Sequence, residues 1–172
     1  MLATIADLLT FSRVIAAGVL VWLGTRGPTS LPTAALVPVL AWTTDQLDGW
    51  VARRAAGPTR LANFDFPIDA TYYLGILTYL VLARFLPPLP VLAFVLLSLA
   101  AWLALRRKAI AIVSVRIVDL TCATLLLIHA PWLAGLALVW LALLGLIYRK
   151  RLRERVPRWF RELRALARGR RA

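Results

Sequence analysis

Residues 45–69, DQLDGWVARRAAGPTRLANFDFPID, carry four aspartates: Asp45, Asp48, Asp65 and Asp69. The 172-residue chain has only eight acidic residues, so half of them lie in this one stretch. The sequence on both sides of the stretch is strongly apolar. Acidic side chains next to or inside apolar segments are destabilising and are usually retained for function. We therefore expect this stretch to carry the chemistry of the protein.

The composition around this stretch is that of a membrane protein. Hydrophobic residues make up 61% of the chain and charged residues 17%, and the mean hydropathy is +0.77. These values are too apolar for a soluble domain of this length. Apolar runs close to the roughly 20 residues needed to cross a bilayer predict an all-α integral membrane domain over residues 1–150 with six transmembrane helices. We place them at about 8–25, 31–52, 64–84, 88–105, 109–128 and 131–148.

The basic residues predict the orientation in the membrane. With six spans and a cytoplasmic N-terminus, the inner loops carry six Lys and Arg residues and the outer loops carry two, which fits the positive-inside bias. We expect an integral protein of a bacterial-type inner or plasma membrane with both termini in the cytoplasm. The inner residues are Arg53, Arg54, Arg60, Arg106, Arg107 and Lys108, and the outer ones are Arg26 and Arg84.

The basic tail, residues 151–172, has a helical pattern of its own. From Pro157 to Arg168, apolar residues such as Trp159 and Leu163 share one face and arginines lie opposite. This pattern predicts a C-terminal amphipathic interfacial helix on anionic membrane lipids. Nucleic-acid binding is the competing interpretation of a basic tail. We expect no nucleic acid, because a tail attached to a membrane span meets lipid headgroups first.

The four aspartates fall into two helical pairs. Asp45 and Asp48 are three residues apart on the second segment, and Asp65 and Asp69 are four apart on the third, so each pair lies on one helix face. Two helices joined by a short loop run antiparallel, which lets the pairs face each other. At 1.5 Å per residue, Asp48 lies about 7 Å inside the cytoplasmic end marked by Arg53. The sequence thus predicts a shallow site on the cytoplasmic side.

Four carboxylates in such a site need balancing cations. Two divalent ions would cancel all four charges, and oxygen-only ligands favour Mg²⁺ or Mn²⁺. Paired ions of this kind clamp phosphoryl groups during displacement, so we expect a phosphate-handling enzyme. Gly49 and Ala52 leave room for a nucleotide diphosphate, and Arg53 adds a cation for its phosphates. The alternative is that the small residues only ease helix packing and the carboxylates pair with arginines.

These residues resemble a known family. Asp45-Gln-Leu-Asp48-Gly49-Trp-Val-Ala52-Arg53, with Asp65 and Asp69 downstream, is similar to the signature of the CDP-alcohol phosphatidyltransferases. That signature is D-x-x-D-G-x-x-A-R, then eight residues and G-x-x-x-D-x-x-x-D. At the N-terminus, Asp7-Leu-Leu-Thr10-Phe-Ser-Arg13 is similar to the N-x-x-T-x-x-R stretch of such proteins. This chain departs from the signature in a loop one residue shorter and in Ala62 at the second glycine position.

The resemblance implies a function and a role for each site residue. The function is transfer of a phosphatidyl or related phosphoalcohol group in phospholipid synthesis. The donor is CDP-linked, with CDP-diacylglycerol expected, the acceptor is a small hydroxyl compound, and CMP is released. The resemblance further implies a homodimer. Asp45, Asp48, Asp65 and Asp69 would bind the two metal ions, Asp69 would also act as general base, and Gly49, Ala52 and Arg53 would bind the nucleotide.

Other interpretations stay open at this point. Arg116 on the fifth segment is a candidate for binding an acceptor phosphate, and an internal ion pair with Asp119 is the equal alternative. An intramembrane acidic quartet could also form a cation transporter, although the fourth and sixth segments have almost no polar residues. The altered glycine position favours a catalytically silent lipid- or nucleotide-binding relative. Release of CMP from CDP-diacylglycerol distinguishes the enzyme from both.

Overall fold

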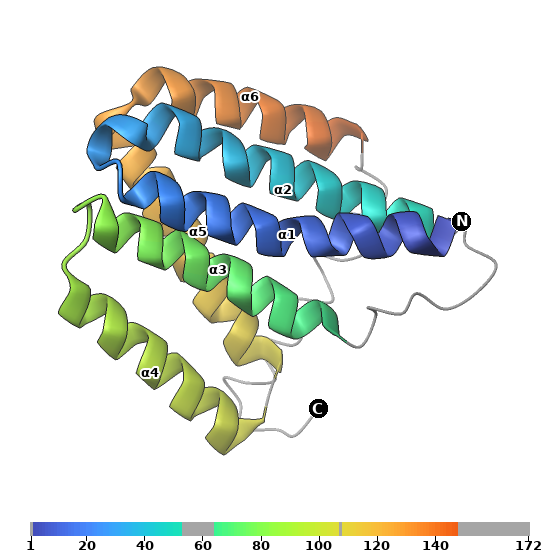
Figure 1. Ribbon diagram of the computed structural model, residues 1–172, viewed down its shortest axis with the longest axis horizontal. Helices are drawn as coiled ribbons and strands as arrows, with labels where there is room; N and C mark the ends of the chain where they lie inside the picture. The colour runs from blue at the N-terminus through green and yellow to red at the C-terminus, as the bar shows by residue number, and fades with distance from the viewer. Residues whose placement is uncertain (1, 53–63, 107, 148–172) are drawn as a thin grey trace. The chain divides into compact units, whose positions relative to one another are not determined.

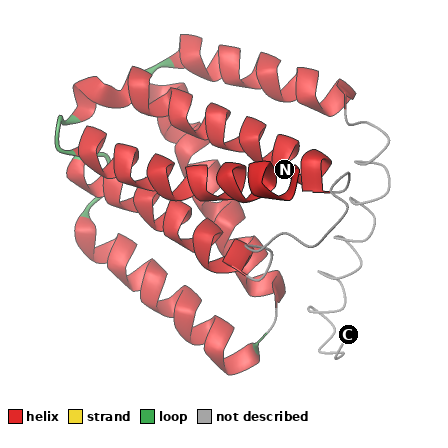
Figure 2. Ribbon diagram, turned by 45° about the vertical axis from the view of Figure 1, so that its right-hand side comes forward, coloured by secondary structure: helices red, strands yellow, loops and turns green. Residues whose placement is uncertain are grey.

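The computed structural model describes residues 2–52, 64–106 and 108–147. Figure 1 gives the course of the chain, and Figure 2 shows that helices and short connections make up these ranges, with no strand in them. The six predicted segments each correspond to one α-helix. The helices are α1 (Leu2–Gly24), α2 (Leu31–Ala52), α3 (Asp65–Leu82), α4 (Pro88–Leu105), α5 (Lys108–His129) and α6 (Pro131–Ile147), with a 3₁₀ helix, η1 (Pro28–Ser30), before α2.

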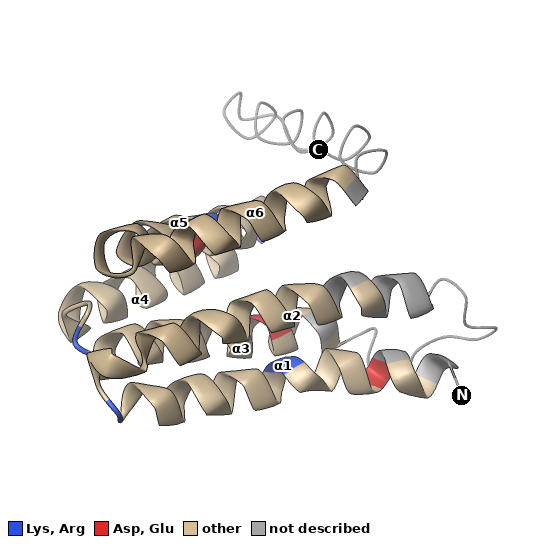
Figure 3. Cartoon of the chain, turned by 90° about the horizontal axis from the view of Figure 1, so that it is seen from above, with Lys and Arg blue, Asp and Glu red and all other residues tan. Residues whose placement is uncertain are grey.

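Length and composition identify three candidate membrane spans among the described helices. They are Asp7–Gly24, Pro88–Leu105 and Ala109–His129, and two shorter apolar helices cover Phe66–Leu82 and Pro131–Leu146. Figure 3 shows that charged residues are sparse along the described helices. The all-helical membrane class is therefore supported, whereas the count of six spans stays a prediction. The tail helix and the domain boundary at residue 150 lie outside the described residues.

The helix ends follow from local sequence. Proline occupies the first position of α4 and α6, where its missing N–H removes no helical hydrogen bond. The turn between α1 and α2 passes through Gly27, whose φ of 76° is readily adopted only by glycine. This turn is short, and so is the connection between α5 and α6, so the helices joined by each run antiparallel.

The chain divides into two compact units, residues 1–93 and 94–172, and each is described by itself. In the first unit, α1 packs against both α2 and α3 and lies between them (Figure 1). Most of its buried side chains are apolar, and α1 and α3 supply most of these. The core residues of this unit include Ala17, Leu20, Leu23, Ala34, Ala41, Ile68, Tyr72, Ile76, Leu77, Tyr79 and Leu80.

Small residues bring α1 and α3 into close contact, and we call this contact the α1–α3 seam. A Cβ added at Gly75 would lie 2.8 Å from the Cα and Cβ of Ala17, and one at Gly24 would lie 2.9 Å from the Cβ of Leu82. Glycine and alanine allow helix backbones to approach in this way in membranes. Ala17 of α1 lies against Gly75 of α3, and Gly24 lies further along α1 against Leu82, which lies further along α3. The two helices therefore run parallel. This direction agrees with the alternating course predicted for the first three segments.

In the second unit, α5 packs against α6. Among the described residues of this unit, the buried ones are few and small or branched: Val118, Ala130, Leu133 and Ala134. Large apolar side chains such as Leu120, Leu127 and Leu138 are exposed. Helix α4 begins in the first unit and ends in the second, and none of its side chains is buried. Such exposed apolar surface suits a hydrocarbon solvent, which forms no hydrogen bonds and favours side chains of this kind.

Candidate functional site

The backbone of the first unit brings the aspartate-bearing helix ends to one end of the three-helix group. Asp45 and Asp48 lie in the last two turns of α2, and Asp65 is the first residue of α3. Asp69 follows one turn later. Figure 1 shows this end of α2 and the start of α3 on the same side as the N-terminal end of α1. The predicted grouping of the two pairs is thus consistent with the course of the helices.

Most of the predicted site side chains lie outside what the structure describes. This is true of the side chains of Asp45, Asp48, Ala52 and Asp65 and of the surroundings of Gly49, although the backbones of all five belong to α2 and α3. Arg53 lies outside the described residues altogether. The mutual orientation of the two aspartate pairs therefore stays a prediction. Asp69 is the predicted carboxylate whose surroundings the structure describes.

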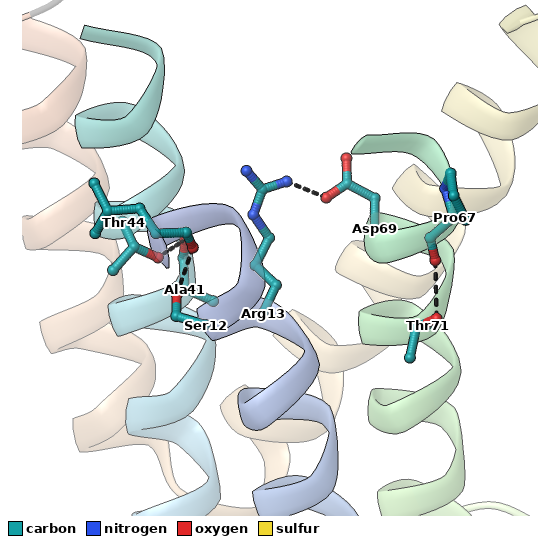
Figure 4. Close-up of polar contacts among 8 residues, drawn as sticks. Ser12, Arg13, Ala41, Thr44, Pro67, Asp69 and Thr71 are labelled. Carbon is teal, nitrogen blue, oxygen red and sulfur yellow. Dashed lines mark hydrogen bonds and ion pairs between the residues drawn. The ribbon is translucent and has the colours of Figure 1, made fainter. Parts of the chain in front are cut away.

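Asp69 forms an ion pair with Arg13 of α1. The Arg13 Nη1 donates a hydrogen bond to the Asp69 Oδ1, across 56 residues of sequence (Figure 4). The two side chains differ in burial: that of Arg13 is 6% exposed and that of Asp69 is 47% exposed. The guanidinium thus lies on the protein side of the carboxylate, and half of the Asp69 side-chain surface stays open. One interpretation of the sequence is that the aspartates pair with arginines, and at Asp69 such a pair is present.

Arg13 is a site residue whose role was not predicted from the sequence. It lies in the first apolar segment one turn after Thr10, and both residues are buried. Two signals in the sequence point to it. An arginine inside an apolar segment is itself a functional candidate, and Arg13 fills the arginine position of the N-x-x-T-x-x-R stretch. What the sequence lacked was the register that places α1 against the start of α3.

Hydroxyl groups near the pair bond to their own helices. Ser12 donates to the carbonyl of Leu9 at 2.6 Å, Thr44 to that of Ala41 at 2.9 Å, and Thr71 to that of Pro67 at 2.8 Å. Figure 4 shows Thr44 and Thr71 on the helices that flank Arg13. Such back-bonding satisfies a hydroxyl within an apolar segment. These three hydroxyl groups therefore donate their protons to carbonyl groups of their own helices. The hydrogen bond to Asp69 comes from Arg13.

A divalent metal site is tested by the chemistry of the residues that would form it. No group of three or more His, Cys, Asp or Glu side chains gathers within the described residues, and three of the four predicted ligands have undescribed side chains. Asp69 itself fits: it offers a hard oxygen ligand, and the hydrogen bond from Arg13 engages only Oδ1. The donor set of four carboxylates at one end of the helices is suited to Mg²⁺ or Mn²⁺.

Arg116, the candidate for the acceptor phosphate, lies on α5 in the second unit. Its Nη1 donates to Asp119 Oδ2 at 2.7 Å, and the side chains are 59% and 16% exposed. The internal ion pair expected as the alternative is therefore present. It uses one edge of a guanidinium that carries five N–H donors. Binding of an acceptor by Arg116 stays a prediction.

Comparison with known proteins gives one match. A family model described as CDP-alcohol phosphatidyltransferase matches residues 3–150. No curated protein and no solved structure matches the chain. The matched residues include all four aspartates of the predicted site and both members of the Arg13–Asp69 pair. The resemblance found in the aspartate stretch thus extends over most of the chain.

Proposed function

The chain belongs to the CDP-alcohol phosphatidyltransferase family, and from this premise we propose that it moves a phosphatidyl or related phosphoalcohol group from CDP-diacylglycerol to a small hydroxyl acceptor. CMP is the second product. The observation that carries the proposal is the family match over residues 3–150, which includes the complete set of four aspartates. Phospholipid synthesis is the corresponding process, and the membrane helices agree with a lipid substrate.

A lipid-linked donor is supported by the expected depth of the site. Asp48 lies five residues before Arg53, which corresponds to about 7 Å along a helix. A carboxylate site at this depth is within reach of the phosphates of a lipid whose acyl chains remain in the bilayer. We place the site on the cytoplasmic side of a bacterial-type inner or plasma membrane, with both termini in the cytoplasm, on the distribution of basic residues.

Asp69 is proposed as the general base. Its carboxylate takes the proton of the acceptor hydroxyl, and the acceptor oxygen forms a bond to the β-phosphorus of the donor. The bond between the β-phosphorus and the bridging oxygen breaks, and CMP leaves with that oxygen. A half-exposed carboxylate supports this role, because the acceptor must approach it within hydrogen-bond distance. Arg53 is proposed to bind the phosphate that becomes part of CMP.

The family is generally dependent on divalent metals, and the aspartates of this chain suit them. We propose that Asp45, Asp48, Asp65 and Asp69 hold two divalent cations, Mg²⁺ or Mn²⁺, which supply positive charge to the diphosphate. Gly49 and Ala52 are proposed to leave space for the cytidine nucleotide next to the helix backbone. Arg116 is proposed to bind a phosphate on the acceptor, and the active protein is proposed to be a homodimer.

The proposal is tested by transfer in detergent micelles. Purified protein is given labelled CDP-diacylglycerol, Mg²⁺ and a panel of small hydroxyl acceptors, and lipid products and CMP are separated by chromatography. We expect one acceptor to yield a new phospholipid with an equal amount of CMP, and Asp48→Asn to abolish both. Binding of CDP-diacylglycerol without CMP release for any acceptor would instead identify a catalytically silent relative.

A further inference from the structure

The Arg13–Asp69 pair is built so that one partner is enclosed and the other is open. Arg13, on a mostly apolar helix, has 6% of its side chain exposed, and Asp69 has 47% exposed. A desolvated guanidinium is stable only with an ionic or hydrogen-bonding partner. The open member is the residue proposed as base.

The position of the pair is fixed by the α1–α3 seam. Arg13 precedes Ala17 by one helical turn, and Asp69 precedes Gly75 by six residues, so both lie within two turns of the close Ala17–Gly75 contact. The backbones there cannot slide or separate without losing that contact. Arg13 therefore presents its guanidinium to Asp69 from a closely packed neighbouring helix, and not from the helix that carries Asp69 (Figure 4).

The hydrogen bond engages one carboxylate oxygen of Asp69. Nη1 of Arg13 binds Oδ1, which restrains rotation of the carboxylate about its Cβ–Cγ bond and fixes the direction of Oδ2. We propose that Arg13 is a positioning residue for the transfer reaction: it holds Asp69 by Oδ1 so that Oδ2 is aimed at the acceptor hydroxyl. This inference rests on the proposed function, and it adds a residue on α1 to a site otherwise formed by α2 and α3.

The kinetic test compares Arg13→Met and Arg13→Lys with the unchanged protein in the CMP-release assay. Loss of a group that orients a reacting carboxylate lowers activity by roughly 10–100-fold. We expect this loss in kcat for Arg13→Met, with the KM for CDP-diacylglycerol little changed, and partial recovery in Arg13→Lys, which keeps the charge. A kcat for Arg13→Met within about twofold of the unchanged protein overturns the proposal.

Two control variants separate positioning from general weakening of the fold. Arg26→Met removes an exposed arginine in the turn after α1, where it lies over the ring of Trp22. Gly24→Ala crowds the far end of the same seam, against Leu82 and Tyr79. We expect Arg26→Met to keep its kcat. If Gly24→Ala, at an equal loss of thermal stability, lowers kcat as much as Arg13→Met does, the role of Arg13 is structural only.

A second readout requires neither metal nor turnover. Thermal unfolding in detergent with EDTA is measured for Arg13→Met, Asp69→Ala and the double variant. If the pair exists in the metal-free protein, the double variant loses less in Tm than the sum of the single losses. Additive losses in Tm would show that Arg13 and Asp69 do not interact, and would overturn the proposal even if the protein is an active transferase. Conversely, failure of the unchanged protein to release CMP contradicts the proposed function and leaves the coupling of the pair to be judged from Tm alone.

Discussion

The two arginine–aspartate pairs of the described structure differ in origin. Arg13 and Asp69 come from different helices, 56 residues apart, and the arginine is enclosed. Arg116 and Asp119 are three residues apart on one helix, and the arginine is mostly exposed. The local pair needs only helix formation, whereas the distant pair needs the correct packing of α1 on α3. Only the distant pair therefore reports on the tertiary fold.

The largest expected difference between the pairs is in catalysis. A general base contributes about 10²–10⁴-fold to rate, so Asp69→Asn should lower CMP release by a factor in this range. Donor binding should persist, because the amide keeps an oxygen in place. Asp119→Asn, the matched change in the local pair, should leave turnover at saturating acceptor close to that of the unchanged protein. A comparable loss in both variants would contradict the assignment of the base.

The next difference is in energetic coupling. Double-variant cycles on both pairs, with methionine for the arginine and alanine for the aspartate, should give about 1–2 kcal/mol for Arg13–Asp69. The Arg116–Asp119 cycle should give less than about 0.5 kcal/mol. The reason is that α5 remains helical when it separates from its neighbours, so the local pair persists in the unfolded reference state. The coupling energies are measured by unfolding titrations in detergent. Equal values for the two pairs would contradict the claim that only Arg13–Asp69 depends on tertiary packing.

The α1–α3 seam that positions the distant pair can be tested with two glycines. Gly75→Ala places a Cβ 2.8 Å from Ala17, and this overpacking should destabilise the protein by about 1–2 kcal/mol. Gly18 lies next to Ala17 on α1, and an added Cβ there meets nothing within 4 Å. Gly18→Ala should therefore be neutral or slightly stabilising, by less than about 1 kcal/mol. An equal loss of stability in the two variants would show that the seam is not tight.

A further expected effect concerns the acceptor. If Arg116 binds an acceptor phosphate, Arg116→Gln should raise the KM for that acceptor by roughly tenfold, the loss of one charge-assisted hydrogen bond. The KM for CDP-diacylglycerol should not change, because the donor is assigned to residues of α2 and α3. Steady-state kinetics with each substrate varied in turn measures both values. A rise for the donor alone would place Arg116 outside the acceptor site.

Much of the fold followed from the apolar pattern of the sequence. Runs of about 20 apolar residues predicted all six helices, since a bilayer forces every backbone group into internal hydrogen bonds. The positions of Pro88, Pro131 and Gly27 mark helix boundaries in the way their backbone chemistry requires. What hydropathy could not predict was the neighbour of each helix, because lipid and protein surfaces of a membrane helix are equally apolar.

The candidate site was predicted in part. The spacing of the aspartates predicts two pairs, one near the end of α2 and one at the start of α3, and the family match includes all four. How the two pairs face each other stays a prediction. Arg13 received no role because its partner lies 56 residues away and depends on the register set by Ala17 and Gly75. Pairing across helices is a property of packing, and single-sequence patterns do not encode it directly. For Arg116 the local spacing left two equal alternatives, and one of them, the ion pair with Asp119, is present.

The central claim is that Asp69, held by Arg13, is the base of the transfer reaction and not only a metal ligand. The most direct measurement is CMP release from CDP-diacylglycerol by Asp69→Asn over a Mg²⁺ titration. We expect turnover to stay far below that of the unchanged protein at every Mg²⁺ concentration, because added metal cannot replace a lost proton acceptor. Full recovery of turnover at high Mg²⁺ would contradict the claim and leave Asp69 as a ligand alone.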